Sequence, residues 1–74
     1  MERQRVSSSN LASVGYDAEN MILEVEFRNG SVYRYSGVPF GIYTDLLNAR
    51  SKGRYFHDHI RERYRYKRIK KRYH

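Results

Sequence analysis

The sequence predicts a single α+β domain in which a three-stranded antiparallel β-meander is followed by two α-helices packed on one face of the sheet. Apolar and charged residues alternate with a period of two over residues 21–28, and an Asn29-Gly30 pair follows directly. From Pro39 onward the apolar residues recur every three or four positions, which is the helical spacing. A chain of 74 residues leaves room for one hydrophobic core and no second domain.

The predicted strands cover residues 11–16, 21–28 and 31–35. The second is the clearest, because Leu23, Val25 and Phe27 alternate with charged side chains as in a strand with one buried face. The polar stretch Asp17-Ala18-Glu19-Asn20 is predicted to form the turn between the first two strands.

The length of the turn at Asn29-Gly30 decides which way the third strand faces, because a shift of one residue moves every side chain to the other face. A two-residue loop would place Tyr33 beside Glu26. A three-residue loop with left-handed Gly30 instead forms three pairs: Val25 with Tyr33, Leu23 with Tyr35, and Glu24 with Arg34. We prefer this register because it gathers the apolar side chains on one face and forms a charge pair on the other. Tyr33 and Tyr35 are then core residues, and the alternative is an exposed platform for stacking bases.

Two helices are predicted after the strands. The first runs from about Pro39 to Arg50, and Pro39 suits a first helical turn because its missing N–H needs no partner there. Ser51-Lys52-Gly53 then supplies both a stop and a candidate cap. The second helix is predicted to run into the basic tail and to fray after Tyr66, and its apolar positions are Phe56, Ile60 and Tyr64.

The chain divides into three predicted segments. Residues 1–9 are Ser-rich and lack periodic apolar residues, so we expect a flexible N-terminal arm. Residues 10–66 form the folded domain, and residues 67–74 form a basic C-terminal extension.

Three spaced motifs run through the folded part: Phe27-x-x-Gly30-x-x-Tyr33-x-Tyr35-x-x-Val38-Pro39, then Ala49-x-Ser51-x-Gly53-x-Tyr55-Phe56, then Ile60-x-x-x-Tyr64. In this order they resemble the KTSC domain, a family named for its occurrence at the C-terminus of some lysyl-tRNA synthetases and also found as small stand-alone bacterial and phage proteins. The resemblance covers roughly residues 8–66. It implies a small domain with a central Tyr-x-Tyr motif, matched by Tyr33 and Tyr35 in a structural role, and it suggests RNA binding by association. Asp58 stands where an Asn is often seen, so nothing is carried over at that position.

The net charge is concentrated at one end of the chain. The chain carries 15 Lys and Arg and 8 Asp and Glu, which gives a formal net charge of +7. Residues 1–60 hold seven of each sign and cancel, whereas residues 61–74 hold eight bases and the single acid Glu62. Because Lys and Arg release counterions from phosphates, such a segment predicts polyanion binding with a log K against log salt slope of roughly −4 to −6. A solvated tail that only keeps the protein soluble is the alternative.

The predicted site is this basic, tyrosine-containing C-terminal helix, with RNA rather than DNA as the favoured polyanion. Tyrosine rings and guanidinium planes stack on unpaired bases, which favours single-stranded or looped RNA. Tyr64 also fits the apolar face of the helix, so its role stays open. The candidate nucleic-acid-binding residues are Arg61, Arg63, Arg65, Tyr66, Lys67, Arg68, Lys70, Lys71, Arg72 and Tyr73.

Two other partners compete with RNA. A protein could dock on the sheet or helix surface while the tail meets an acidic patch. An anionic membrane surface is the second, although the apolar stripe available to it is thin. That stripe consists of Tyr66, Ile69 and Tyr73.

No enzymatic site is predicted, and we expect neither a metal nor another cofactor. The chain has no cysteine, which excludes disulfides and thiolate chemistry. His57 and His59 flank Asp58, but on a helix they point about 200° apart and cannot share a metal ion. The N-terminus lacks an apolar run, so we expect a cytoplasmic protein without a membrane span.

Overall fold

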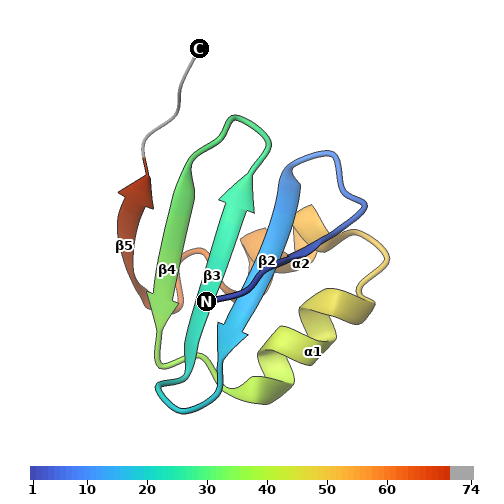
Figure 1. Ribbon diagram of the computed structural model, residues 1–74. Coiled ribbons are helices and arrows are strands. Elements are labelled where there is room, and N and C mark those ends of the chain that lie inside the picture. The colour runs from blue at the N-terminus through green and yellow to red at the C-terminus, as the bar shows by residue number, and fades with distance from the viewer. Residues whose placement is uncertain (71–74) are drawn as a thin grey trace.

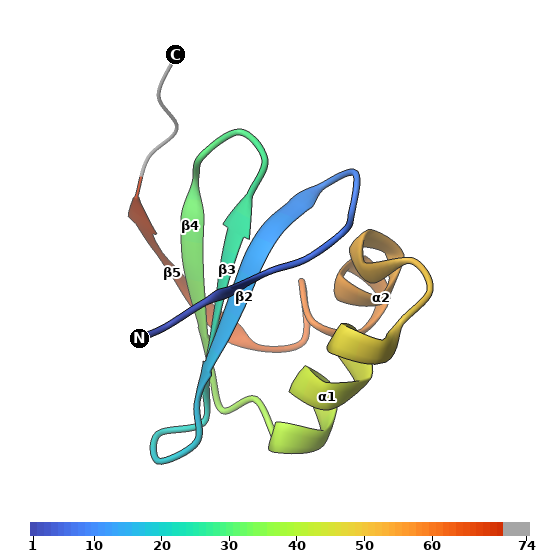
Figure 2. The same cartoon turned by 45° about the vertical axis from the view of Figure 1, so that its right-hand side comes forward.

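One antiparallel sheet with two helices on one face forms the architecture of the computed structural model, which describes residues 1–70 (Figures 1 and 2). The strands lie side by side in chain order, β1-β2-β3-β4-β5. The elements are β1 (Gln4–Arg5), β2 (Leu11–Asp17), β3 (Ile22–Phe27), β4 (Val32–Ser36), α1 (Phe40–Asn48), α2 (Lys52–His59) and β5 (Arg65–Lys70).

The predicted register of the β3–β4 hairpin is confirmed. Val25 lies opposite Tyr33, Leu23 opposite Tyr35 and Glu24 opposite Arg34. The loop has three residues, closed by a hydrogen bond of 2.9 Å from the Phe27 N–H to the Ser31 carbonyl. Gly30 has a φ of 93°, a left-handed conformation that glycine adopts at little cost.

The core lies between the sheet and the helices. Its sheet side consists of Leu11, Val14, Leu23, Val25 and Tyr35, and its helix side consists of Val38, Leu46, Phe56 and Ile60. Ser51 caps α2 as the sequence indicates, because its side chain accepts a hydrogen bond from the Arg54 N–H. The predicted helix positions Phe56 and Ile60 are buried, and Tyr64 packs against the core.

The α+β class with two helices is confirmed, but the described residues form five strands and not three. The larger error concerns the C-terminal segment, which was expected to continue α2. The helix ends at His59, and Arg65–Lys70 return along β4 as β5. A helix with bases around most of its circumference would repel itself, whereas a strand on the open edge of β4 gains backbone hydrogen bonds.

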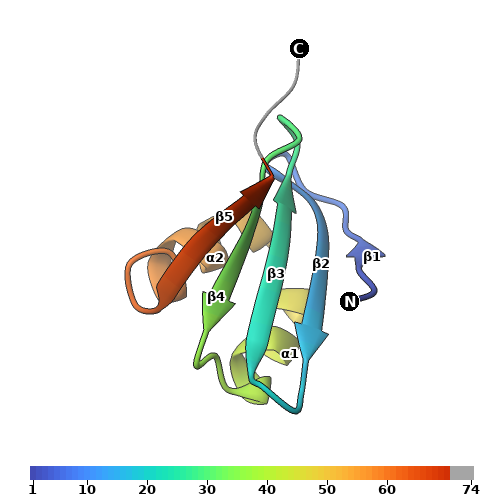
Figure 3. The same ribbon diagram turned by 60° about the vertical axis from the view of Figure 1, so that its left-hand side comes forward.

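The fifth strand comes from the N-terminal arm. Gln4 and Arg5 pair with Val14 and Ser13 of β2, and the Val6 N–H donates to the Ala12 carbonyl over 3.1 Å. Figure 3 shows β1 and β5 at opposite edges of the sheet. Residues 1–9, predicted as an arm without regular structure, therefore contribute a short edge strand.

Candidate nucleic-acid interface

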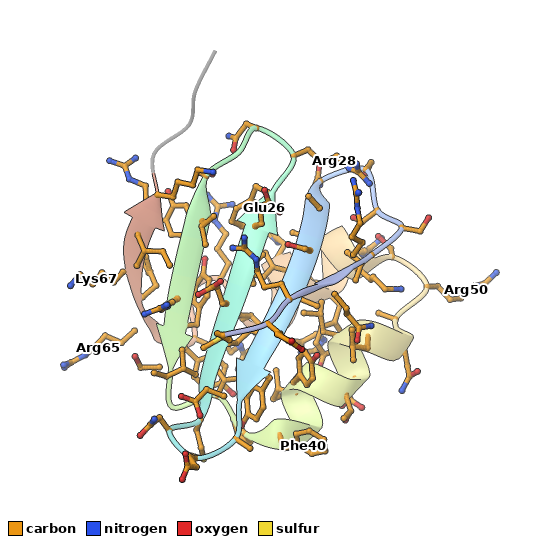
Figure 4. All side chains as sticks on the ribbon, in the orientation of Figure 1. Glu26, Arg28, Phe40, Arg50, Arg65 and Lys67 are labelled. Carbon is orange, nitrogen blue, oxygen red and sulfur yellow. The ribbon has the colours of Figure 1, made fainter. Side chains whose placement is uncertain are left out.

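Strand β5 carries basic side chains on both faces of the sheet. Its register with β4 places Arg65 opposite Ser36 and Lys67 opposite Arg34, on the face away from the helices. Tyr66 lies opposite Tyr35 on the helix-facing side. Every residue of β5 is exposed, and Figure 4 shows Arg65 and Lys67 extending from this edge, on the opposite side of the molecule from Arg50.

Arg68 completes the helix-facing side of β5, because it lies opposite Tyr33. The register shifts between Val32 and Tyr33, so that one extra residue of β5 opposes this point of β4. Arg68 and Tyr66 therefore stand two residues apart on the side of the sheet that carries the tyrosines.

Three basic residues of β5, Arg65, Lys67 and Arg68, are not neutralised by the acidic side chains of residues 1–70. Glu24, which is 5% exposed, is held by Arg3 over 2.9 Å and by Arg34 over 2.8 Å. Within residues 1–70, Arg65, Lys67 and Arg68 form no ion pair with an acidic side chain. They remain available to an external anion.

Five aromatic rings join β5 to the rest of the domain. The Tyr66 ring lies 5.7 Å from the Tyr35 ring and 5.6 Å from the Tyr33 ring. Phe56 of α2 contacts Tyr35 from the other side at 5.4 Å, and Phe27 lies 5.3 Å from Phe56. These centroid distances are typical of favourable aromatic pairs. We call these five residues the aromatic cluster.

The aromatic cluster lines a cleft of about 670 Å³ between the sheet and α2, which we call the aromatic cleft. Arg61 and Glu62, from the turn after α2, lie on one side of it. The loops before β2 and after β3 form its polar end, and their lining residues are Ser9, Asn10, Arg28, Asn29 and Ser31. Gly53 and His57 of α2 also line it.

Tyr35 lies deepest among the tyrosines of the cleft. It is 3% exposed, and burial raises the pKa of its hydroxyl to about 12. Charge on the neighbouring Tyr33 and Tyr66 would add to this rise, whereas the Arg61 guanidinium lowers the pKa of Tyr35. The Tyr35 side chain is therefore neutral at physiological pH and part of the hydrophobic floor.

The predicted site residues lie in different surroundings from those expected. Arg61 and Arg63 lie in the turn after α2 and not on a helix, and Arg61 borders the aromatic cleft. Lys70 is the last residue of β5 and has interactions of its own. Lys71, Arg72 and Tyr73 lie outside the described residues.

Several residues of the aromatic cleft were absent from the sequence-based prediction. They are Asn10, Phe27, Arg28, Asn29, Phe56 and His57. The motif positions Phe27 and Phe56 were visible as apolar residues, but nothing local indicates that loops so distant in sequence meet at one end of the sheet. The alternation of Tyr64 and Tyr66 with Arg63, Arg65 and Lys67 was a period-two signal for a strand.

The histidine segment forms no larger cluster. His57 and Asp58 approach to 3.3 Å, and Asp58 also lies 3.7 Å from Arg54. Across residues 1–70, no group of three or more potential metal ligands comes together. Nor does any helix in that range have the length and apolarity needed to cross a membrane.

Comparisons with known proteins agree with this architecture. The family model described as the KTSC domain matches residues 7–66. The chain is 49% identical over 70 residues to an uncharacterised protein of Stutzerimonas stutzeri, covering 93% of this chain and 99% of that one. It is 41% identical over 54 residues to the lysine–tRNA ligase of Trichormus variabilis, covering 73% of this chain but 10% of the ligase.

A solved structure gives the same result. The crystal structure of a KTSC domain protein from Yersinia pestis superimposes with a TM-score of 0.91 at 40% identity, covering 93% of this chain and 97% of that one. The match therefore extends over nearly the whole length of both proteins, including the sheet and both helices. The chain belongs to the KTSC domain family.

Proposed function

We propose that the protein is a non-catalytic nucleic-acid-binding module that prefers RNA and binds it along β5. The observation that carries the proposal is the exposure of Arg65, Lys67 and Arg68 without an acidic partner among residues 1–70. Phosphates are the counter-charges that such an array attracts, because neutralising them releases condensed cations. The strand thus replaces the predicted helix as the binding element.

The aromatic residues next to this array favour an unpaired strand over a duplex. Tyr66 is 58% exposed and stands on β5 between Arg65 and Lys67. A base that has left its stack can lie on such a ring, whereas a base inside a duplex cannot. Contacts from the basic side chains to phosphates and stacking of a nucleobase on Tyr66 together fit single-stranded or looped RNA.

The comparisons support RNA as the polyanion. Part of the Trichormus variabilis lysine–tRNA ligase is similar to this chain, and its name states that it joins lysine to a tRNA. A domain attached to an enzyme of that kind works beside RNA. This similarity covers 10% of the ligase, so the ligase reaction itself is not proposed for this chain.

The test is a titration of fluorescent single-stranded RNA with the full chain at several salt concentrations. The triple variant Arg65→Gln, Lys67→Gln and Arg68→Gln removes three phosphate contacts. Each phosphate contact to a single strand adds about 0.7 to the slope of log K against log salt. Loss of three contacts should therefore lower the affinity about 100-fold near 0.1 M salt and flatten that slope by about 2. DNA of the same sequence should bind more weakly than the RNA.

A matched control removes the same charge elsewhere. The control variant is Arg50→Gln, Lys52→Gln and Arg54→Gln. Arg50 lies in the turn between α1 and α2, on the opposite side of the molecule from Arg65 and Lys67 in Figure 4, and Lys52 and Arg54 lie in the first turn of α2. The proposal predicts that this control binds RNA nearly as the unmodified chain does. If both triple variants lose affinity equally, attraction is a property of net charge alone; if the unmodified chain does not bind at low salt, the proposal is wrong.

Two exposed apolar side chains outside β5 favour a protein partner as the second candidate function. Phe40 is 59% exposed at the start of α1, and Met21 is 44% exposed in the turn between β2 and β3. The Met21 carbonyl accepts a hydrogen bond from the Val38 N–H, which holds this turn near α1. A stoichiometric partner that survives nuclease treatment and is lost in Phe40→Ser would favour this function over RNA binding.

A further inference from the structure

The aromatic cleft combines a rigid buried floor with an exposed aromatic wall. Tyr35 and Phe56 are 3% and 6% exposed, and their rings pack against each other at 5.4 Å. Tyr66 is 58% exposed, while its ring still contacts Tyr33 and Tyr35. A flat aromatic ligand can therefore lie against Tyr66 without the floor having to rearrange.

The polar end of the cleft carries oriented hydrogen-bonding groups. The side-chain oxygen of Asn29 accepts hydrogen bonds from the N–H of Ser31 over 2.9 Å and from its hydroxyl over 2.7 Å. These bonds fix the side-chain amide of Asn29, so that its NH₂ group is the part that a ligand would meet. Asn10 adds a second amide at the same end of the cleft. Two amides at the end of an aromatic cleft can pair with the polar edge of a base.

The rim of the cleft is suited to an anion. Arg28 and Arg61 are exposed and line the cleft, and Glu62 is the acid beside them. Arg28 is steadied by a hydrogen bond of 2.8 Å from its Nε to the Ser8 carbonyl. A ligand that joins a flat polar ring to a phosphate matches the aromatic wall, the amides and the basic rim together.

From these features we infer that the aromatic cleft holds one unpaired nucleotide of a bound RNA strand. Its base stacks on Tyr66, the base edge meets Asn10 and Asn29, and its phosphate lies at Arg61. The cleft volume of about 670 Å³ lies within the range of small-ligand sites and is too small for a duplex. This inference rests on the proposed function, because β5 supplies the contacts to the neighbouring phosphates.

The test compares two short single-stranded RNAs that differ at one position. One is intact, and the other carries an abasic site there, which removes a base but leaves every phosphate in place. If the cleft holds the base, the full chain binds the abasic RNA between about 5-fold and 150-fold more weakly, the range expected for loss of one stacked base. A free mononucleotide is the third ligand, and it should bind far more weakly than the intact strand.

The variant Tyr66→Leu locates the base. It should bind the intact and the abasic RNA with nearly equal affinity, because the stacking wall has gone. Phe40→Leu is the matched control, since Phe40 is 59% exposed and also contacts two tyrosine rings. This variant should retain the full difference in affinity between the intact and the abasic RNA. The comparison of the two RNAs on the unmodified chain needs no variant, so a folding defect in Tyr66→Leu would not leave the inference untested.

The outcomes separate this inference from the proposed function. Equal, salt-dependent binding of the intact and abasic RNAs overturns the nucleotide site and leaves phosphate binding by β5 standing. A mononucleotide that binds as tightly as the strand also overturns it, because the site would then serve a free ligand. Absence of binding to any RNA at low salt overturns the proposed function and the inference together.

Discussion

The two edges of the sheet both carry basic residues, but they use them differently. At the β1 edge, Arg3 reaches the buried carboxylate of Glu24 over 2.9 Å, and Val6 packs against the core. At the β5 edge, Arg65 and Lys67 have no acidic partner among residues 1–70. A basic residue with an acidic partner inside the protein contributes to stability, whereas a basic residue without such a partner is available to a ligand. Net charge alone does not distinguish these cases.

The largest predicted effect comes from breaking the β1 edge. A Cβ atom at Gly15 would collide with the backbone carbonyl of Glu2 and lie 2.9 Å from Cγ of Arg3. We therefore expect Gly15→Val to displace the arm and lower the free energy of unfolding by about 2 kcal/mol, measured by urea denaturation. RNA affinity should stay within about twofold, since β5 is untouched.

A control for this substitution is available in α1. A methyl group at Gly41 would meet no atom within 4 Å, so Gly41→Ala should raise stability by up to about 1 kcal/mol. If Gly15→Val were as stable as the unmodified chain, the arm would not be packed across β2 as described.

The stability of the domain is expected to fall at alkaline pH because of Tyr35, the β4 residue that lies opposite Tyr66 of β5. Its pKa is raised to about 12 in the folded chain, against 10.0 for an unperturbed tyrosine, mainly because of burial. The stabilisation from its neutral form is complete below pH 10 and is lost as the pH rises toward 12, because the unfolded chain gives up this proton first. The expected loss is up to roughly 2 kcal/mol.

Chemical denaturation across this pH range tests the prediction. Tyr35→Phe cannot ionise at this position, so its stability should decline less between pH 10 and pH 12 than that of the unmodified chain. Parallel declines in the two proteins would show that Tyr35 is accessible to water and not part of the floor of the cleft.

One substitution made at both edges sharpens the comparison. Arg3→Gln removes one partner of the buried Glu24 and should lower the free energy of unfolding by about 1 kcal/mol. Arg65→Gln should change stability by less than about 0.5 kcal/mol, as expected for an exposed residue without a partner. RNA affinity should show the reverse order, falling about fivefold near 0.1 M salt for Arg65→Gln alone. Equal effects at the two edges would remove the distinction between them.

The smallest effect on stability is expected when Arg65 of β5 is given an acidic partner on β4. Ser36 is exposed and lies opposite Arg65, so Ser36→Glu would create a cross-strand ion pair. Stability should rise by a few tenths of a kcal/mol, while RNA affinity should fall about fivefold near 0.1 M salt. Ser36→Gln is the uncharged control, and a similar loss of affinity in it would point to shape rather than charge.

The central part of the fold was predictable from the sequence because its signals are local. Alternation around Val25 and the Asn29-Gly30 turn specify the hairpin and its register, and Ser51 marks the start of α2. The edge strand β1 was missed for the opposite reason. Gln4–Arg5 is a strand of two polar residues without a pattern of its own, stabilised by pairing with β2.

The candidate site was predictable only in composition. The spacing of Tyr66, Ile69 and Tyr73 is compatible with a helix, while the alternation of Tyr64 and Tyr66 with arginines is compatible with a strand. The open edge of β4 decides between them, and that edge is a tertiary feature. The aromatic cleft depends on long-range contacts between loops, β4 and α2, so no short segment of sequence could indicate it.

A map of backbone amide chemical shifts, recorded with and without a short single-stranded RNA at low salt, tests the central claim most directly. If β5 binds the strand, the largest shifts fall on Arg65–Lys70 and on Arg61 beside the cleft, while Gln4 and Phe40 barely move. Shifts concentrated around Phe40 and Met21 instead, or no shifts at all, would contradict RNA binding by Arg65, Lys67 and Arg68.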